Sequence, residues 1–340
     1  MKRFEHGGNF PYGIIDFSVN INPLGMPDSA KKILAGNIGR FSEYPDPDST
    51  ELVRKLSEYE KIQPDNIVCG NGAADLIYRL VHALKPHRAL LVSPTFSEYE
   101  KALTENGCRI KFHALRETEN FCITERILED LHDADVFFLC DPNNPTGSLA
   151  SCELMEKIVR RCAEEKITLI LDRCFMDFTG RSDGDTALLL NNNTVILKAF
   201  TKIYAMAGLR LGYMISGNAE LSEKVRRTGQ CWSVSVPAQL AGIVALQEVG
   251  YIKRTVSFIR RERDFLCRSL QRPEIKIYPS ETNYLLLQGS MPFDKLLLQK
   301  NIAVRSCENY RGLNDRYFRI AVKDHSNNER LVNAVNEITG

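Results

Sequence analysis

The sequence predicts an α/β protein whose main domain is a three-layer α/β/α structure with a mainly parallel seven-stranded sheet, followed by a smaller α+β domain. Up to about residue 219, short apolar runs alternate with segments of helical periodicity, as expected for strands joined by crossover helices. Beyond that point, two helical stretches precede short strand-like runs and a last helix. A chain of 340 residues is long enough to bury a core in both parts.

The strands of the main sheet are predicted where apolar runs are bounded by turn residues, at residues 66–69, 89–92, 109–113, 136–140, 168–172, 194–198 and 212–216. Helices are predicted between them at 73–83, 96–106 and 153–165. The later part is predicted to contain helices at 237–248, 251–270 and 327–338, and strands at 275–278, 283–288 and 317–322. These elements divide the chain into an N-terminal arm (1–40), a large domain (41–240) and a small C-terminal domain (241–340).

Composition and charge argue against several classes of protein. A net charge of +1 gives no reason to expect nucleic acid or an anionic membrane as a partner. The N-terminus lacks the apolar segment of a signal peptide, and no apolar run reaches the ~18 residues of a membrane span, so we expect a cytoplasmic protein. The ten cysteines include no C-x-x-C pair and the six histidines lack ligand spacing, which predicts free thiols and no metal site.

The segment 201–213 contains the first candidate catalytic residue. Lys202 follows the apolar run 194–197, next to Thr201, and Arg210 comes eight residues later. A lysine at a strand end can form a Schiff base with an aldehyde cofactor, and the arginine can bind the cofactor's phosphate. Most lysines are solvated surface charges, so this interpretation depends on partners elsewhere in the sequence.

A small-residue turn supplies a candidate phosphate site. Gly72, Ala73 and Ala74 lie between a predicted strand and a predicted helix. A helix N-terminus offers free N–H groups and a positive dipole end, so the three amides could bind a phosphate. The alternative is a tight β–α turn with no ligand. The dinucleotide-binding motif does not apply, because its third glycine is missing.

Two polar residues follow buried strands. Asn144, in the turn 141–147, could donate an amide N–H to a phenolate oxygen, or could belong only to the turn. Asp172 closes the apolar run 168–171, where a carboxylate needs a cationic or hydrogen-bonding partner. A protonated pyridine nitrogen is one such partner, and capping of the next element is the alternative.

Tyr99 and Arg319 are two further candidates. Tyr99 could stack on a planar ring, although a tyrosine at helical spacing also serves in ordinary packing. Arg319 is a charge inside the apolar run 317–322, so it should meet a carboxylate. That carboxylate could come from a ligand or from an internal salt bridge.

Taken in order, the motifs GNGAAD, PTFSEY, DPNNPTG, LDRCF, the Thr-Lys pair with its arginine, and FRIAV resemble those of the fold-type I pyridoxal phosphate enzymes. The resemblance is to the class I/II aminotransferase superfamily and spans nearly the whole chain. It implies pyridoxal 5′-phosphate as cofactor, with Lys202 as the Schiff-base lysine and Asp172 as the partner of the pyridine nitrogen.

The same resemblance implies the remaining cofactor contacts. Asn144 would contact the ring oxygen O3′, Tyr99 would stack on the ring, and Arg319 would bind the substrate α-carboxylate. Arg210 and the amides of the turn at 72–74 would bind the phosphate. Tyr44 matches a tyrosine that reaches this phosphate from a partner subunit, which implies a homodimer with shared active sites.

The N-terminus resembles one group within the superfamily. His6, Gly7, Gly8 and Asn9, followed by a segment that contains Asn20, look like the threonine-phosphate decarboxylases of cobalamin side-chain synthesis. These five residues would then bind a phosphorylated amino acid, and the reaction would yield (R)-1-aminopropan-2-yl phosphate and CO₂ from L-threonine O-3-phosphate. Histidinol-phosphate aminotransferases share the other motifs but usually lack the HGGN sequence, and a related aminotransferase is the alternative. The residues alone, without this resemblance, favour a disordered or merely packed N-terminus.

Three positions depart from the family pattern. Ala199 replaces a serine or threonine that often contacts the cofactor phosphate, Arg173 replaces a glutamate, and Phe175 replaces a tyrosine that often shares O3′. None of the three removes a required catalytic group. We expect them to weaken the affinity for the cofactor.

Overall fold

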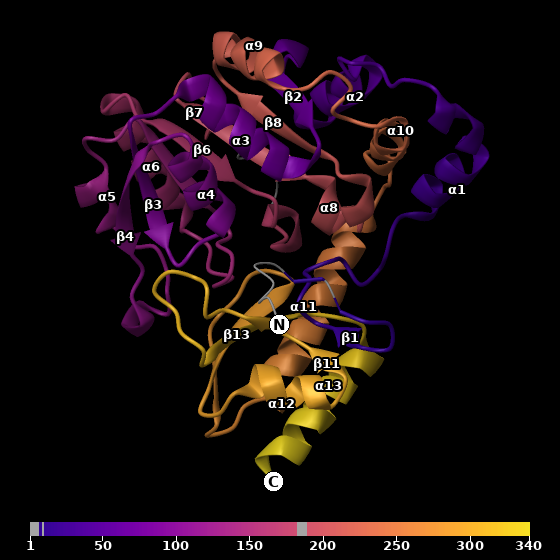
Figure 1. Cartoon of the computed structure of the whole chain (residues 1–340), viewed down its shortest axis with the longest axis vertical. Coiled ribbons are helices and arrows are strands. Elements are labelled where there is room, and N and C mark those ends of the chain that lie inside the picture. The colour runs from indigo at the N-terminus through magenta and orange to yellow at the C-terminus, as the bar shows by residue number, and fades with distance from the viewer. Residues whose placement is uncertain (1–6, 9, 182–188) are drawn as a thin grey trace.

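The computed structural model describes residues 7–8, 10–181 and 189–340, which form two lobes (Figure 1). The large lobe is built on a seven-stranded sheet of order β2-β8-β7-β6-β5-β3-β4. All its neighbouring strands are parallel except β8, which is antiparallel to both β2 and β7. Its strands are β2 (Ile67–Gly70), β3 (Arg88–Ser93), β4 (Arg109–Ala114), β5 (Val136–Cys140), β6 (Thr168–Asp172), β7 (Thr194–Ala199) and β8 (Gly212–Ser216).

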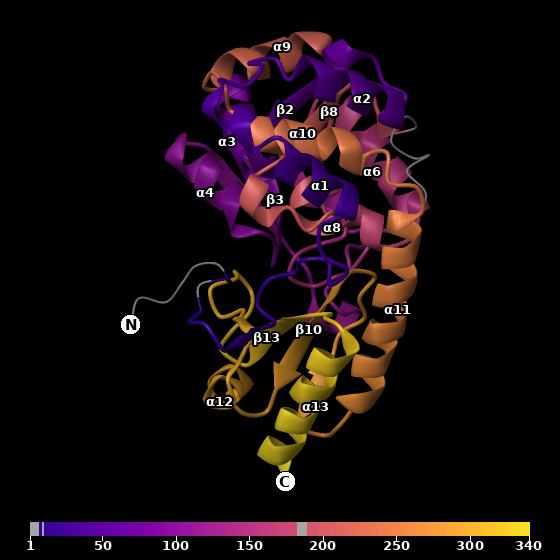
Figure 2. The same ribbon diagram turned by 90° about the vertical axis from the view of Figure 1, so that its right-hand side faces the viewer.

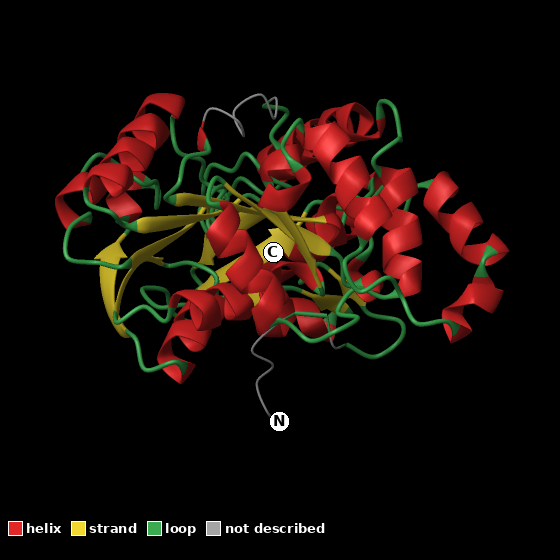
Figure 3. Cartoon of the chain, turned by 90° about the horizontal axis from the view of Figure 1, so that it is seen from above, coloured by secondary structure: helices red, strands yellow, loops and turns green. Residues whose placement is uncertain are grey.

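Helices cover both faces of this sheet, as the view from above shows (Figure 3). Side chains that alternate along the central strands enter two separate apolar clusters: Phe138 and Ile170 join one, while Leu139 and Leu171 join the other. Helices α3 (Gly72–Leu84), α4 (Ser97–Glu105) and α9 (Ala219–Thr228) contribute to the first cluster. Helices α2 (Thr50–Glu60), α6 (Cys152–Glu164) and α10 (Val236–Ala245) contribute to the second. The predicted three-layer fold is confirmed.

The small lobe contains a four-stranded antiparallel sheet of order β12-β13-β10-β9. Its strands are β9 (Ile275–Ile277), β10 (Tyr284–Gly289), β12 (Arg305–Ser306) and β13 (Tyr317–Ala321). Its helices are α12 (Phe293–Gln299) and α13 (His325–Thr339), and the long helix α11 (Tyr251–Ser269) runs along both lobes (Figure 2).

The N-terminal segment belongs to the small lobe, although it begins the chain. Strand β1 (Ile15–Asp16) pairs in parallel with β11 (Ile302–Ala303), and the amide of Ala321 donates to the carbonyl of Phe17 at 2.9 Å. Helix α1 (Asp28–Gly36) then packs against α10 of the large lobe. The segment before α1 therefore crosses from one lobe to the other.

The predicted strands and the six predicted helices agree with the structure to within a few residues at their ends. The sequence did not indicate α1, α2, α9, α12 or the two-residue strands β1, β11 and β12. All ten cysteines are free. Among the described residues, no helix combines the length and apolarity needed to span a membrane. The domain limits at 40 and 240 stay a prediction.

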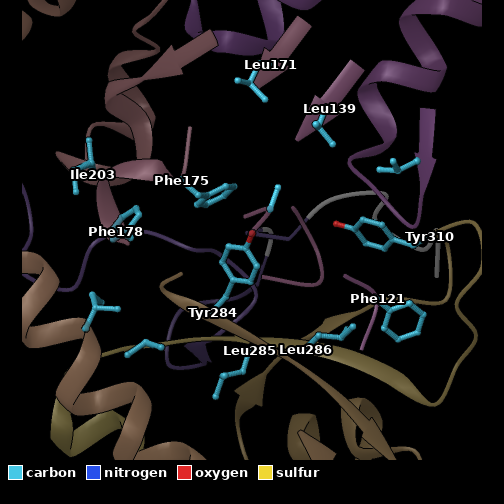
Figure 4. Packing of buried hydrophobic residues seen from close by; sticks show 14 of the residues in the cluster. Phe121, Leu139, Leu171, Phe175, Phe178, Ile203, Tyr284, Leu285, Leu286 and Tyr310 are labelled. Carbon is cyan, nitrogen blue, oxygen red and sulfur yellow. The ribbon is translucent and has the colours of Figure 1, made fainter. Parts of the chain in front are cut away.

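The carboxyl ends of β5, β6 and β7 face the small lobe, which brings their loops against β10 and β13. Tyr284 of β10 extends across the boundary toward Phe175, which follows β6 (Figure 4). The two rings meet edge to face at 4.9 Å, and the Tyr284 hydroxyl donates to the carbonyl of Asn143 at 2.8 Å. This boundary is where ligands bind in open α/β sheets.

Candidate active site

A cavity of about 410 Å³ lies between the lobes and collects most of the predicted site residues. The large lobe contributes Asn144, Asp172 and Lys202, and the small lobe contributes Arg319. The N-terminal segment contributes Gly7 and Asn20, and other predicted residues that line it are Ala73, Ala74, Tyr99, Thr201 and Arg210. The volume suits a small ligand enclosed on several sides.

Lys202 lies in the short helix α8 (Phe200–Ile203), which follows β7 directly. Burial, and next the positive charge of Arg319, lower the pKa of its amine to about 8. The more distant Arg210 acts in the same direction. A lysine with this pKa has a far larger uncharged fraction near neutral pH than a solvated lysine, and the uncharged amine is the nucleophilic form.

Asp172 ends β6 and is buried, with 5% of its surface exposed. Its Oδ1 accepts from the Cys174 amide at 3.0 Å, and its Oδ2 accepts from the Tyr99 hydroxyl at 2.6 Å. No lysine, arginine or histidine in the described part of the chain forms an ion pair with it. The next short helix begins only at Met176, so helix capping does not explain this carboxylate. A cationic ligand atom in the cavity would supply its missing counter-charge.

The turn before α3 has the geometry that an anion site requires. Gly72 has a φ of +79°, and a Cβ there would lie 2.5 Å from Nη2 of Arg210. Arg210 therefore lies across the N-terminus of α3, and its Nη2 donates to the carbonyl of Asn71 at 3.5 Å. Only glycine allows the guanidinium to come this close to the helix end, where amides and dipole favour an anion.

Asn144 and Arg319 come together from different lobes. Arg319 Nη1 donates to Asn144 Oδ1, its Nη2 donates to the carbonyl of Ser18 at 2.8 Å, and its buried Nε has no partner. Because Oδ1 of Asn144 accepts from the guanidinium, its NH₂ group remains as a donor. No carboxylate among the described residues pairs with Arg319, so the internal salt bridge considered above does not form there.

Tyr99 lines the cavity from a buried position. Its ring is 0% exposed and stacks on Phe138 with the centroids 5.2 Å apart, and its stacking on a cofactor ring stays a prediction. Phe96, three residues earlier, is only half-buried and also lines the cavity. Phe96 is therefore a second aromatic ring that a planar ligand in the cavity could contact.

The predicted substrate segment is described in part. Gly7 lines the cavity, and the Gly8 amide donates to Ser18 Oγ at 3.0 Å. Asn20 is 2% exposed, and its Oδ1 has no hydrogen-bond partner. A ligand in the cavity could therefore donate a hydrogen bond to this oxygen. His6 and Asn9 lie outside the described residues.

Tyr44 does not line this cavity. It is 79% exposed and stacks on the partly exposed Trp232 at 4.4 Å. An exposed aromatic pair is typical of an interface, and the contact of Tyr44 with a second subunit stays a prediction.

Two residues of the cavity were missed by the sequence argument. Arg305 of β12 is 7% exposed and lies directly opposite Arg319 in the sheet register. Its guanidinium donates to the Ser306 carbonyl at 2.8 Å and to Asn309 Oδ1 at 2.9 Å, and lies 5.4 Å from the centre of the Tyr310 ring. The Tyr310 hydroxyl in turn reaches Asn144 Oδ1 at 3.5 Å. A two-residue strand has no sequence periodicity, so nothing local marked this arginine.

The residues present fit pyridoxal 5′-phosphate. The cavity provides an anion site at Arg210 and α3, an amine with a lowered pKa at Lys202, and a buried carboxylate without a counter-charge at Asp172. The departures are also compatible with this fit. Ala199 and Phe175 line the cavity without polar atoms, whereas Arg173 lines a separate cavity of about 280 Å³ next to Asp141.

Comparison with known proteins agrees with this site. A family model described as aminotransferase class I and II matches residues 12–335. The chain is 40% identical to the threonine-phosphate decarboxylase of Salmonella typhimurium, covering 98% of this chain and 97% of the relative. The histidinol-phosphate aminotransferase structure from Clostridium acetobutylicum has a TM-score of 0.89 at 30% identity, and the L-threonine-O-3-phosphate decarboxylase structure from Porphyromonas gingivalis has 0.86 at 25%, each covering 96% of this chain and 99% of the other. The chain belongs to the aminotransferase class I and II family and is a pyridoxal 5′-phosphate-dependent enzyme.

Proposed function

We propose that the protein decarboxylates L-threonine O-3-phosphate to (R)-1-aminopropan-2-yl phosphate and CO₂. The observation that carries this proposal is the pair of buried guanidiniums, Arg305 and Arg319, which lie opposite each other in neighbouring strands and both line the cavity. Two guanidiniums besides the one beside the cofactor-phosphate site favour a substrate with two separate anionic groups. A phosphorylated α-amino acid has its carboxylate and its phosphate a few bonds apart.

Each cation has a distinct place in this proposal. Arg319, whose Nε lacks a partner and which contacts Asn144, binds the α-carboxylate. Arg305, on the side of Tyr310 and Asn309, binds the substrate phosphate. In the N-terminal segment, Gly7 lines the cavity and its amide supplies a further donor to the phosphate. Asn20 Oδ1 supplies an acceptor for a hydrogen-bond donor of the substrate.

Reaction choice depends on how the carboxylate is oriented. The cofactor, when bound, supplies an electron-withdrawing ring that weakens the Cα bond perpendicular to its plane. Arg319 and Asn144 fix the direction of the carboxylate and therefore decide which bond takes that position. After CO₂ leaves, Cα needs a proton, and the Lys202 amine, with its pKa lowered to about 8, can donate one near neutral pH.

The alternative reaction is transamination of histidinol phosphate or a related substrate. The likeness to the histidinol-phosphate aminotransferase structure at 30% identity supports this second candidate. The 40% identity to a threonine-phosphate decarboxylase over nearly the whole chain and the HGGN sequence at residues 6–9 support the first.

A single set of incubations tests the choice. The purified enzyme is mixed with threonine phosphate, serine phosphate or histidinol phosphate, with and without 2-oxoglutarate, while CO₂ and glutamate are measured. Unphosphorylated threonine is the matched control for the phosphate group. We expect CO₂ from threonine phosphate without a keto acid. Glutamate from histidinol phosphate, with no CO₂ from threonine phosphate, would refute the proposal.

The proposal includes an assembly and a cellular role. We infer a cytoplasmic homodimer in which Tyr44 reaches the cofactor phosphate of the partner subunit, supported by the exposed Tyr44–Trp232 pair. Sedimentation would test the dimer. The product matches the aminopropanol phosphate of the cobalamin side chain, and genes for cobamide synthesis beside this one would support that role.

A further inference from the structure

The hydroxyl of Tyr99 has a single carboxylate partner. The ring is enclosed by Phe138, stacked at 5.2 Å, and by Phe96, edge-on at 5.6 Å. Both contacts fix the ring, and the hydroxyl donates to Asp172 Oδ2 at 2.6 Å. The hydroxyl of this tyrosine is therefore engaged by the carboxylate of Asp172.

Tyr99 keeps its proton under all ordinary conditions. Burial, and next the negative charge of Asp172, raise the pKa of its hydroxyl well above 10. A phenol in this state is a permanent donor and cannot exchange roles with the carboxylate. The 2.6 Å distance to Asp172 Oδ2 is short for a hydrogen bond between two oxygen atoms.

The two oxygens of Asp172 are fixed by different donors. The Cys174 amide occupies one position on Oδ1 at 3.0 Å, and Tyr99 occupies one position on Oδ2. An ionised carboxylate has about four acceptor positions, so further positions remain on the side that lines the cavity. The two protein donors set the plane of the carboxylate and the direction of those free positions.

We propose that Tyr99 is a positioning residue for Asp172. Its hydroxyl holds the carboxylate in one orientation toward the cavity, where the ring nitrogen of the cofactor would lie, so it acts on that nitrogen only through Asp172. Without it, one oxygen of a buried carboxylate loses its donor, and the group can rotate. This role is the same whichever substrate the enzyme uses.

The test compares two buried tyrosines that each donate to a buried carboxylate. Tyr99→Phe removes the donor to Asp172, and Tyr213→Phe removes the donor to Glu60, 2.5 Å away and outside the cavity. For each variant, absorbance titration of the apoprotein measures the affinity for pyridoxal 5′-phosphate. The same titration uses the 1-deaza analogue, which has carbon in place of the ring nitrogen.

We expect Tyr99→Phe to weaken binding of pyridoxal 5′-phosphate about tenfold and to change binding of the analogue less than about twofold. Tyr213→Phe should change neither. An equal loss for both ligands would mean a merely structural role and would overturn the proposal, as would no loss for either.

If Tyr99→Phe proves unstable, a second variant distinguishes the positioning role of Tyr99 from a merely structural one. In an Asp172→Asn background, adding Tyr99→Phe should cost no further affinity for pyridoxal 5′-phosphate, because the group through which Tyr99 acts is already altered. A further tenfold loss in that background would overturn the proposal. Thermal unfolding of each apoprotein shows whether the variants are folded.

Discussion

The proposed function divides the cavity into a cofactor end and a substrate end, and the two are built from different parts of the chain. The cofactor end consists of Asp172, Lys202 and the anion site at Arg210, all at strand ends of the large sheet. The substrate end consists of Arg305 and Arg319 on the small sheet, with the N-terminal segment. The residues of the cofactor end follow buried strands of the large sheet. The residues of the substrate end lie on short strands and on a segment far away in the sequence.

Because of this difference, the residues proposed for the chemistry and the residues proposed to select the substrate lie on separate structural elements. Central strands of the large sheet are buried along their whole length, so the groups at their ends are fixed by a rigid framework. Arg319 and the segment after Gly8 are instead joined by a few hydrogen bonds, such as that from Nη2 to the Ser18 carbonyl. The substrate end can change without disturbing the cofactor end, as expected for a fold that serves many reactions.

The largest effect is expected at the cofactor end. Lys202→Ala should lower kcat/KM on the order of 10⁴-fold or more and should abolish the absorbance band of the lysine-bound cofactor, because Lys202 is the one lysine among the described residues that line the cavity. Lys224→Ala, an exposed lysine paired with Glu220, is the control and should change neither quantity. A variant at Lys202 that kept the band would show that another amine holds the cofactor.

Substitution of Arg305 and of Arg319 should affect phosphorylated and unphosphorylated threonine differently. Arg305→Ala should lower kcat/KM for threonine phosphate about a hundredfold, because a buried charge partner of the phosphate is removed. Arg319→Ala should cause a similar or larger loss for threonine phosphate. The ratio of kcat/KM for threonine phosphate to that for threonine is the measurement.

Only Arg305→Ala should bring that ratio toward one, since Arg319 serves the carboxylate that both substrates share. If both variants changed the ratio alike, the separate assignment of carboxylate and phosphate would be wrong.

The pH dependence of cofactor uptake connects the two ends. Since the pKa of Lys202 is lowered to about 8, a smaller fraction of the amine is protonated at any pH than in a solvated lysine. The uptake rate of the apoprotein should rise with pH and level off above about 8, rather than above 10. Arg319→Gln removes a cation that lowers this pKa, so its inflection should move to higher pH. Stopped-flow absorbance between pH 6 and about 10.5 measures both curves, and an unchanged inflection would contradict the coupling.

The smallest effect is expected in the N-terminal segment. A Cβ on Gly7 would lie 2.5 Å from Ser18 Oγ, the atom that accepts from the Gly8 amide. Gly7→Ala should therefore displace this segment and raise KM for threonine phosphate by about threefold to tenfold, the cost of roughly one hydrogen bond. Gly36→Ala, where a Cβ meets nothing within 4 Å, is the matched control. An equal KM for both variants would show that this segment takes no part in substrate binding.

The cofactor end was predictable because its signals are local. An apolar run that forms a buried strand of the expected sheet precedes each of Lys202, Asp172 and Asn144. A turn of small residues before α3 indicated the candidate anion site. The substrate end lacks such signals. Arg305 lies in a two-residue strand, and its position opposite Arg319 exists only through pairing with β13.

The contacts of Tyr99 could not be predicted for a similar reason. A motif places an aromatic residue near a cofactor, but whether its face or its hydroxyl is used depends on the partner that the fold supplies. Here Phe138, from a strand far along the chain, covers the ring, and Asp172 accepts from the hydroxyl. Neither contact can be read from the spacing of the motif.

The pairing of β1 with β11 has a consequence for synthesis of the protein on the ribosome. Residues near 15 find their strand partner only at Ile302 and Ala303, and Phe17 accepts from Ala321. A growing chain that has completed the large sheet still has its first residues without a place to dock. Because domains fold largely as they emerge, the cofactor end should form early in synthesis. The substrate end should form only when the last strand leaves the ribosome.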